Sequence, residues 1–244
     1  MKIAAIADIH GNLAALEAVL AEIQRHAPDL IVNLGDSLSG PLFPAECADL
    51  LLSCNISAIK GNHERQLLTL PVGAMGESDQ YAASCLQPHH LRWIEKTPET
   101  LLIEGEILLV HGTPRSDLEY YLETVEQGAV RAATPQEVEE RTRGAHASLI
   151  FCGHTHIPRR FTFADQRVVV NPGSVGLPAY EDDRPFPHKM QSASPHARYA
   201  LVEKRGKTWS ATLRSTVYDW ELAARVAESR GRRDWAAALR TGLI

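Results

Sequence analysis

The sequence predicts an α/β domain whose first strands form a parallel sheet. Short apolar runs suited to buried strands alternate with segments in which apolar residues recur at helical spacing. Each of these runs ends in a polar loop, so the N-terminal part of the chain follows a βαβαβ order. Such an alternation favours parallel strands with helices on the faces of the sheet.

The N-terminal elements can be placed one by one. Residues 2–7 form an apolar run that predicts the first strand, and Asn12 is a suitable N-cap for the helix behind it. Residues 30–34 predict a second buried strand, which ends at a glycine. A short helix over residues 45–53 then leads to a third strand over residues 56–60.

The remainder of the chain is less regular. Helices are predicted over residues 84–96 with a break at Pro88, over 134–142 behind a capping pattern, and over 219–240 with an interruption at Gly231. Strands are predicted over residues 101–103, 107–110, 149–152, 167–170, 199–203 and 208–213. Residues 180–195 contain prolines and few apolar residues, which predicts a long loop. We therefore expect a single domain over residues 1–244, with irregular insertions around residues 65–100, 113–145 and 176–196.

Composition and charge narrow the class of protein. The chain has 244 residues, of which 44% are hydrophobic and 23% are charged, as in a globular protein that folds around its own core. The formal net charge of −5 argues against a broad basic surface for non-specific nucleic-acid binding. The four cysteines form no C-x-x-C pair, and no apolar stretch reaches the length of a signal-peptide core or a membrane helix. We expect a soluble cytoplasmic protein.

Polar side chains gather where the predicted strands end. Five of the eleven histidines fall in these turns. Because ligands in open α/β sheets bind at the carboxyl ends of the strands, these side chains are expected to meet at one edge. The turns are Asp8-Ile9-His10, Gly35-Asp36, Gly61-Asn62-His63-Glu64, His111-Gly112 and Gly153-His154-Thr155-His156.

The chemistry of this set indicates metal binding. Carboxylate, amide oxygen and imidazole together form a mixed nitrogen and oxygen site, which suits transition metals better than calcium. Seven such ligands suit two ions roughly 3.5–4 Å apart that share one carboxylate. Taken alone, Asp8 would suit a helix N-terminus, Asn62 a turn, and His111 a satisfied core position. Their combination at successive strand ends favours the metal interpretation.

The motifs D-x-H, G-D, G-N-H-E, H-G and G-H-T-H, in this order, resemble those of the calcineurin-like metallophosphoesterase superfamily. The segment Asn171-Pro172-Gly173-Ser174 is similar to one in its small bacterial and archaeal phosphodiesterase branch. These motifs span Asp8 to Ser174, about two thirds of the chain. The resemblance implies a four-layer α/β sandwich, in which two mixed β-sheets are flanked by helices.

The resemblance also implies a role for each residue of the set. It places Asp8, His10 and His156 on a first ion, Asn62, His111 and His154 on a second, and Asp36 on both. His63 is then not a ligand but the general acid that protonates the leaving oxygen. Glu64 would orient the loop or the imidazole. We expect two divalent transition-metal ions, most simply Mn²⁺, with iron, zinc, nickel and cobalt as alternatives.

The expected activity is that of a metal-dependent phosphoric ester hydrolase, and a phosphodiesterase in particular. A hydroxide that bridges the two ions would attack in line, and Asp36, Asn62 and His63 would carry the catalytic step. A phosphomonoesterase or nucleotide pyrophosphatase at the same site is the first alternative. A non-catalytic protein-binding scaffold on the same fold is the second.

Substrate recognition is where the sequence departs from the family. The Ser/Thr phosphatase and dinucleoside tetraphosphatase branches carry an arginine in a G-D-x-V-D-R-G segment, whereas residues 35–41 here read GDSLSGP. Arg115 could supply a phosphate contact in its place, and a solvated loop arginine is the alternative. We expect a small-molecule phosphoester as the partner and no membrane, find no strong indication of a nucleic acid, and leave homo-oligomers open.

Overall fold

The computed structural model describes residues 1–244 and consists mainly of two five-stranded mixed sheets. The first sheet has the order β14-β13-β1-β2-β3, with β1 parallel to β2, β2 parallel to β3, and the remaining pairs antiparallel. Its strands are β1 (Lys2–Ile6), β2 (Leu30–Asn33), β3 (Ser57–Ala58), β13 (Ala197–Arg205) and β14 (Thr208–Thr216).

The second sheet has the order β4-β5-β8-β10-β9, with β5, β8 and β10 parallel and both edge strands antiparallel. Its strands are β4 (Leu101–Ile103), β5 (Ile107–Leu109), β8 (Leu149–Phe151), β9 (Arg159–Thr162) and β10 (Val168–Asn171). Two separate hairpins complete the strands. They are β6 (Glu123–Glu126) with β7 (Ala129–Ala132), and β11 (Ala179–Asp182) with β12 (His188–Gln191).

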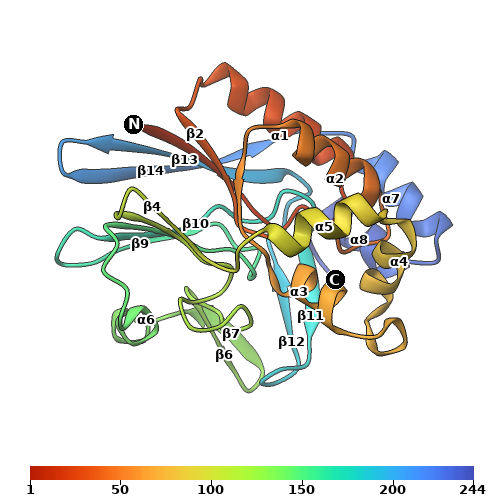
Figure 1. Cartoon of the computed structure of the whole chain (residues 1–244). Coiled ribbons are helices and arrows are strands. Elements are labelled where there is room, and N and C mark those ends of the chain that lie inside the picture. Colours follow the sequence, from red (N-terminus) through yellow and green to blue (C-terminus); the bar gives the residue numbers. More distant parts are fainter.

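Helices cover the outer faces of both sheets, so the molecule has four layers (Figure 1). The helices that pack around the first sheet are α1 (Leu13–Arg25), α2 (Pro44–Ser53), α4 (Glu77–Cys85), α5 (Pro88–Lys96), α7 (Trp220–Ser229) and α8 (Arg233–Thr241). The second sheet is covered by α6 (Pro135–Thr142), while α3 (Asn62–Thr69) and a 3₁₀ turn (Val72–Ala74) lead from β3 to α4. The four-layer sandwich is confirmed.

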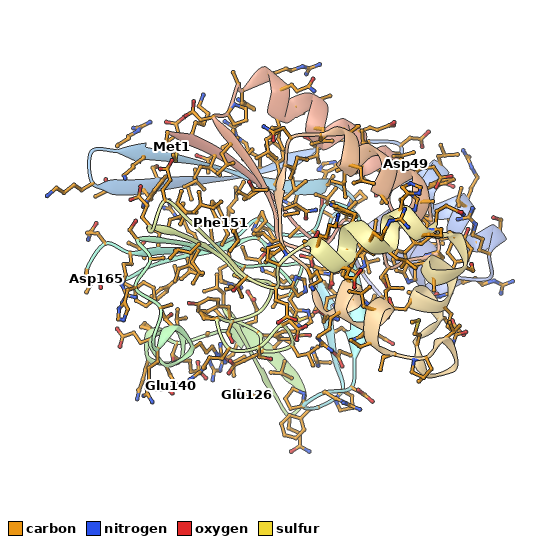
Figure 2. All side chains as sticks on the ribbon, viewed as in Figure 1. Met1, Asp49, Glu126, Glu140, Phe151 and Asp165 are labelled. Atoms are coloured by element: carbon orange, nitrogen blue, oxygen red, sulfur yellow. The ribbon has the colours of Figure 1, made fainter.

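The alternation of side chains along the strands separates the apolar layers. On β1, Ile3 and Ala5 contribute to the core between the two sheets, whereas Ala4 and Ile6 contribute to the core under the helices. Phe151 lies in the inter-sheet core, and Figure 2 shows it in the interior of the molecule. Both faces of each central strand are therefore buried, which explains why these strands appear in the sequence as uninterrupted apolar runs.

Local capping signals predicted the starts of two helices correctly, whereas α3 and most of α4 were not predicted. The side chain of Asn12 accepts a hydrogen bond from the backbone N–H of Ala15 at the start of α1, and Thr134 and Glu137 form a reciprocal capping box at α6. Pro88 occupies the first turn of α5, so the predicted break lies between two helices, although α4 begins at Glu77 and not at Ser84. None of these helices has the length and apolar character needed to cross a membrane.

The prediction of a long loop over residues 180–195 is wrong, because β11 and β12 pair there as a hairpin. The pairing sets Tyr180 opposite Met190 and buries His188, so only a few buried side chains anchor it. Its prolines lie in the connection between the strands, where no ladder hydrogen bond is lost. The sequence pattern also missed β9 and the β6–β7 hairpin, and the third strand is shorter than predicted.

Candidate metal centre

The candidate ligands all follow strands that end on the same side of the two sheets. Asp8 and His10 follow β1, Asp36 follows β2, Asn62 opens α3 after β3, His111 follows β5, and His154 and His156 follow β8. Five of these seven residues have a positive φ, between 51° and 69°, and they are Asp8, His10, Asp36, His154 and His156. Backbone conformations of this kind cost about 1–3 kcal/mol each, and they persist where the surrounding structure holds them and where function uses them.

Asp8, His10 and His156 form a first group at the end of β1. The Nε2 atoms of His10 and His156 lie 3.1 Å apart, and Nε2 of His156 lies 3.6 Å from Oδ1 of Asp8. The Nδ1 atom of His10 faces the carbonyl of Ser39 at 2.8 Å, and that of His156 faces the carbonyl of Leu177 at 2.6 Å. Each Nδ1–H therefore donates to a carbonyl, and each Nε2 keeps a lone pair directed at the other.

Two lone pairs at this distance repel each other unless a cation lies beside them. The surroundings of the Asp8 carboxylate also favour a bound cation. Its Oδ2 is buried without a hydrogen-bond partner, and burial raises the pKa of the Asp8 carboxyl to about 8. Burial also lowers the pKa of His10 to about 4 and that of His156 well below its usual value, so both imidazoles are neutral. A divalent cation fits this donor set.

Asp36, His111 and His154 form a second group, and Asn62 joins it. The Nε2 atom of His111 lies 3.0 Å from Oδ2 of Asp36 and 3.1 Å from Oδ1 of Asn62, while its Nδ1 lies 2.7 Å from the carbonyl of Leu34. Burial acts to lower the pKa of His111, but the Asp36 carboxylate raises it to about 10. A proton on His111 thus neutralises Asp36 where a cation would otherwise do so.

His63 lies beside these groups, one residue after Asn62 on α3. Its Nδ1 lies 2.9 Å from Oδ1 of Asp79, and its backbone N–H donates to Oδ1 of Asp36 over 3.0 Å. Although burial acts to lower the pKa of His63, the carboxylates of Asp36 and Asp79 raise it to about 9. With Nδ1 held by Asp79, the imidazole is oriented by one nitrogen, and Nε2 is the atom that can serve a substrate.

Glu64 organises the loop that carries Asp36. Its buried carboxylate accepts hydrogen bonds from the backbone N–H groups of Gly61, Asp36, Ser37 and Leu38, at 2.7 to 3.2 Å. The sequence left open whether Glu64 orients the loop or the imidazole of His63. These contacts show that it orients the loop. Gly61 is needed beside it, because a Cβ there would lie 2.1 Å from Oδ1 of Asp36.

The segment that begins at Asn171 fixes the ligand loops from the other sheet. The Asn171 side chain donates to the carbonyl of Gly153 over 2.8 Å, and the Ser174 hydroxyl donates to the carbonyl of Asp8 over 2.7 Å. Both residues are buried. These contacts hold the turn after β8 and the turn after β1 against each other, and thereby bring the ligand residues of the two sheets together.

A cavity of about 410 Å³ opens over the two groups. His10, Asp36, Asn62, His63, His154 and His156 line its floor. Its walls come from α3, α4, α8 and the β11–β12 hairpin, and they include Ser39, Tyr180, Asp182, Arg232 and Trp235.

Comparison with known proteins places this geometry in a family. Residues 1–188 match the model of the calcineurin-like phosphoesterase superfamily domain. The chain belongs to this superfamily. The superfamily is metal-dependent, and the two buried His/Asp groups are residues of this member that could hold a metal. A third group, Asp49 with His89 and His90, is largely exposed and lies outside the cavity.

Relatives of the whole chain come from bacteria and archaea. The protein MJ0912 of Methanocaldococcus jannaschii is 28% identical over 203 residues, which are 72% of this chain and 76% of that protein. A metallophosphoesterase from Sphaerobacter thermophilus is 25% identical, with a TM-score of 0.76 and complete coverage of both chains. The protein PH1004 of Pyrococcus horikoshii is 17% identical with a TM-score of 0.76, covers 99% and 98% of the two chains, and shares the fold.

This member of the superfamily differs from the sequence expectation in the walls of its cavity. Arg115 does not line the cavity, and its guanidinium faces Glu119 at 3.9 Å and Glu140 at 3.8 Å. Asp79 and Arg232, by contrast, approach the site without any motif that marks them. Asp79 lies on α4 and Arg232 immediately before α8, and only their three-dimensional placement brings them to the site.

Proposed function

We propose that this superfamily member is a metal-dependent phosphodiesterase. The observation that carries the proposal is the placement of His63. Its imidazole is oriented by the buried carboxylate of Asp79, and it lines the same cavity as both His/Asp groups. A histidine held in this way beside a metal centre suits the protonation of a leaving oxygen.

The ligand roles follow the two groups in the structure. Asp8, His10 and His156 would hold one ion, Asn62, His111 and His154 the other, and Asp36 would contact both, with Mn²⁺ as the proposed metal. When bound, two divalent ions polarise the phosphoryl group and lower the pKa of a coordinated water. Nε2 of His63 donates its proton to the leaving oxygen as the bond from phosphorus to that oxygen breaks. Asp79 keeps the ring in place through Nδ1.

The charges around the cavity favour diesters over monoesters. Arg232 is the only lysine or arginine among the residues that line the cavity, and its guanidinium is paired with Asp234. No free cation is therefore offered to the second negative charge of a monoester, or to the additional charges of a pyrophosphate. A diester carries one negative charge, which the metal centre alone can neutralise.

The experiment compares bis-p-nitrophenyl phosphate with p-nitrophenyl phosphate, using metal-stripped protein before and after addition of Mn²⁺. We expect metal-dependent cleavage of the diester, a loss of turnover in His63→Ala that is smaller for this ester than for one with an alkoxide leaving group, and full activity in the exposed control His146→Ala. Cleavage of the monoester alone would indicate a phosphatase. Two bound metals per chain without cleavage of either ester would contradict catalysis and favour a protein-binding scaffold.

A further inference from the structure

The outer wall of the cavity has an unusual balance of charge. Beyond the two His/Asp groups and His63, its charged side chains are the carboxylates of Glu181, Asp182 and Asp234 and the guanidinium of Arg232. Carboxylates thus outnumber cations in a cavity that receives an anionic substrate. This is the reverse of the basic wall that substrates with several phosphate groups require.

The single cation of this wall, the guanidinium of Arg232, is already paired within the protein. Arg232 donates to both carboxylate oxygens of Asp234, over 3.0 and 2.5 Å, and to the hydroxyl of Ser78 over 2.9 Å. A carboxylate oxygen of Glu77 also lies 3.6 Å from the Nε atom of Arg232. Because the protein already surrounds the guanidinium with two carboxylates and a hydroxyl, Arg232 joins α8 to α4 rather than binding a substrate anion.

Asp182 is the carboxylate of the wall that keeps its charge uncompensated. Glu181 pairs with Lys189 at 3.0 Å, whereas no lysine or arginine lies within ion-pair distance of Asp182. Asp182 is half-buried, and one of its oxygens accepts only the backbone N–H of Arg184. Apolar and aromatic side chains, among them Leu177 and Trp235, line the cavity with it. A negative charge beside such surfaces favours an ammonium group or an uncharged group over an anion.

Ser39 supplies a second, independent indication that a ligand binds in this cavity. Its side chain lines the cavity and is completely buried, yet its Oγ has no hydrogen-bond partner within the protein. An unpartnered buried hydroxyl is costly, so a bound molecule is expected to complete its hydrogen bonding. Ser39 is a neutral donor, which suits a phosphoryl oxygen of low charge.

We propose that the outer wall is a charge filter, in which Asp182 admits phosphodiesters with uncharged or ammonium-bearing substituents and rejects those with a second anionic group. This inference rests on the proposed phosphodiesterase function and specifies its substrate class. The substituent lies against the wall formed by the β11–β12 hairpin and α8.

The test uses three diesters that release the same p-nitrophenolate from the Mn²⁺-loaded protein. These are p-nitrophenyl phosphorylcholine, the p-nitrophenyl ester of thymidine 5′-phosphate, and that same ester with an additional 3′-phosphate. We expect the 3′-phosphate to lower kcat/KM by about tenfold at low ionic strength, and by less as salt screens the wall. Equal or faster cleavage of the 3′-phosphorylated ester would overturn the filter.

Variants at two adjacent aspartates distinguish a specific effect of Asp182 from the general effect of removing one negative charge from the hairpin. Asp182→Asn is expected to lower the ratio of kcat/KM for the choline ester to that for the thymidine ester by about threefold. Asp182→Lys should lower this ratio further and relieve the penalty of the 3′-phosphate. Asp183→Asn is the matched control, because Asp183 is exposed on the same hairpin and does not line this cavity. Equal ratios in Asp182→Asn and Asp183→Asn would overturn the proposal.

Calorimetric titration of choline into the metal-stripped protein gives a readout that does not depend on catalysis. We expect Asp182→Asn to weaken choline binding and Asp183→Asn to leave it unchanged, and the opposite pattern would contradict the filter. Failure of the Mn²⁺-loaded protein to cleave any of the three esters would overturn the proposed function itself. Cleavage of all three at similar rates would overturn the charge filter alone.

Discussion

The floor and the outer wall of the cavity are held in place in different ways. On the floor and in the loops that carry it, the imidazoles of His10, His111 and His156 each direct Nδ1 at a backbone carbonyl, and the carboxylate of Glu64 binds four backbone N–H groups. The wall is held by side chains that contact other side chains. Asp79 with His63 and Arg232 with Asp234 are examples from α4 and α8.

This difference indicates that metal binding and catalysis depend on the floor, and that substrate preference depends on the wall. Backbone partners belong to the core strands and their turns, so they cannot be replaced by mutation without changing the fold. Side-chain partners can be exchanged one at a time. We therefore expect changes at the candidate ligands of the floor to abolish metal binding and activity together, and changes in the wall to alter rate or substrate preference while the metal remains.

The largest effect is expected from the floor. Asp36→Ala removes the carboxylate that lies 3.0 Å from His111 and leaves a buried imidazole whose charged partner is gone. We expect loss of bound metal, measured by elemental analysis, and loss of ester cleavage. If Asp36→Ala kept both metals and full activity, the assignment of the floor as the metal centre would be wrong.

The next largest effect is expected from His63, which lies on the floor but is not a candidate metal ligand. His63→Ala should retain the metals, because His63 contributes to neither group of candidate ligands. General acids contribute about 10² to 10⁴ in rate, and the loss should be greatest for a cyclic nucleotide, whose alkoxide leaving group requires a proton. Nitrophenyl esters should suffer less, since nitrophenolate leaves readily as an anion. Equal losses on both substrates would argue against the role of His63 as an acid.

A smaller effect is expected from the partner of His63 in the wall. Asp79→Asn should lower kcat by about tenfold to a hundredfold with little change in KM, as is typical when the residue that orients a functional histidine is altered. Glu77→Gln is the matched control, because Glu77 is exposed on the same helix and forms no hydrogen bond or ion pair with His63. Similar kcat values in both variants would show that Asp79 does not position the ring.

The floor could be predicted from the sequence because its residues are tied to the strongest local pattern in the chain. Asp8, Asp36 and His154 follow apolar runs that bury both faces of a strand, and parallel strands bring their ends to one edge. The structure places Asp8 with His10 and His156, and Asp36 with His111 and His154, while Asn62 contacts His111. The roles of these residues as metal ligands stay predictions. Sharing of Asp36 between two ions, the metal itself and the acid role of His63 stay predictions.

The wall could not be predicted because its contacts join segments that are distant in the sequence. Asp79 meets His63 across 16 residues, and Arg232 meets Ser78 across 154 residues. The β11–β12 hairpin was taken for a loop because only Ala179, His188 and Met190 are buried along its two short strands. Pairing of this kind depends on tertiary contacts with the rest of the site, which composition and periodicity do not record.

The smallest effect is expected where wall and floor meet, and it tests whether the two regions are independent. The hydroxyl of Tyr180 donates to the carbonyl of His154 over 2.9 Å and lies 2.8 Å from the hydroxyl of Tyr120. Tyr180→Phe leaves that carbonyl without its donor and should lower the free energy of unfolding by about 1–3 kcal/mol. For a chain of this length the melting temperature should fall by about 2–4 °C for each kcal/mol.

Metal content decides how this result is interpreted. The carbonyl of His154 is not among the candidate ligand atoms, so Tyr180→Phe should bind metal as tightly as the unaltered protein. Tyr81→Phe is the control for the loss of a tyrosine hydroxyl that does not line the cavity. A drop in metal affinity for Tyr180→Phe alone would show that the hairpin helps to set the geometry of the floor. In that case the wall would act on the metal centre itself, and exchange of wall residues would change the metal affinity as well as the choice of substrate.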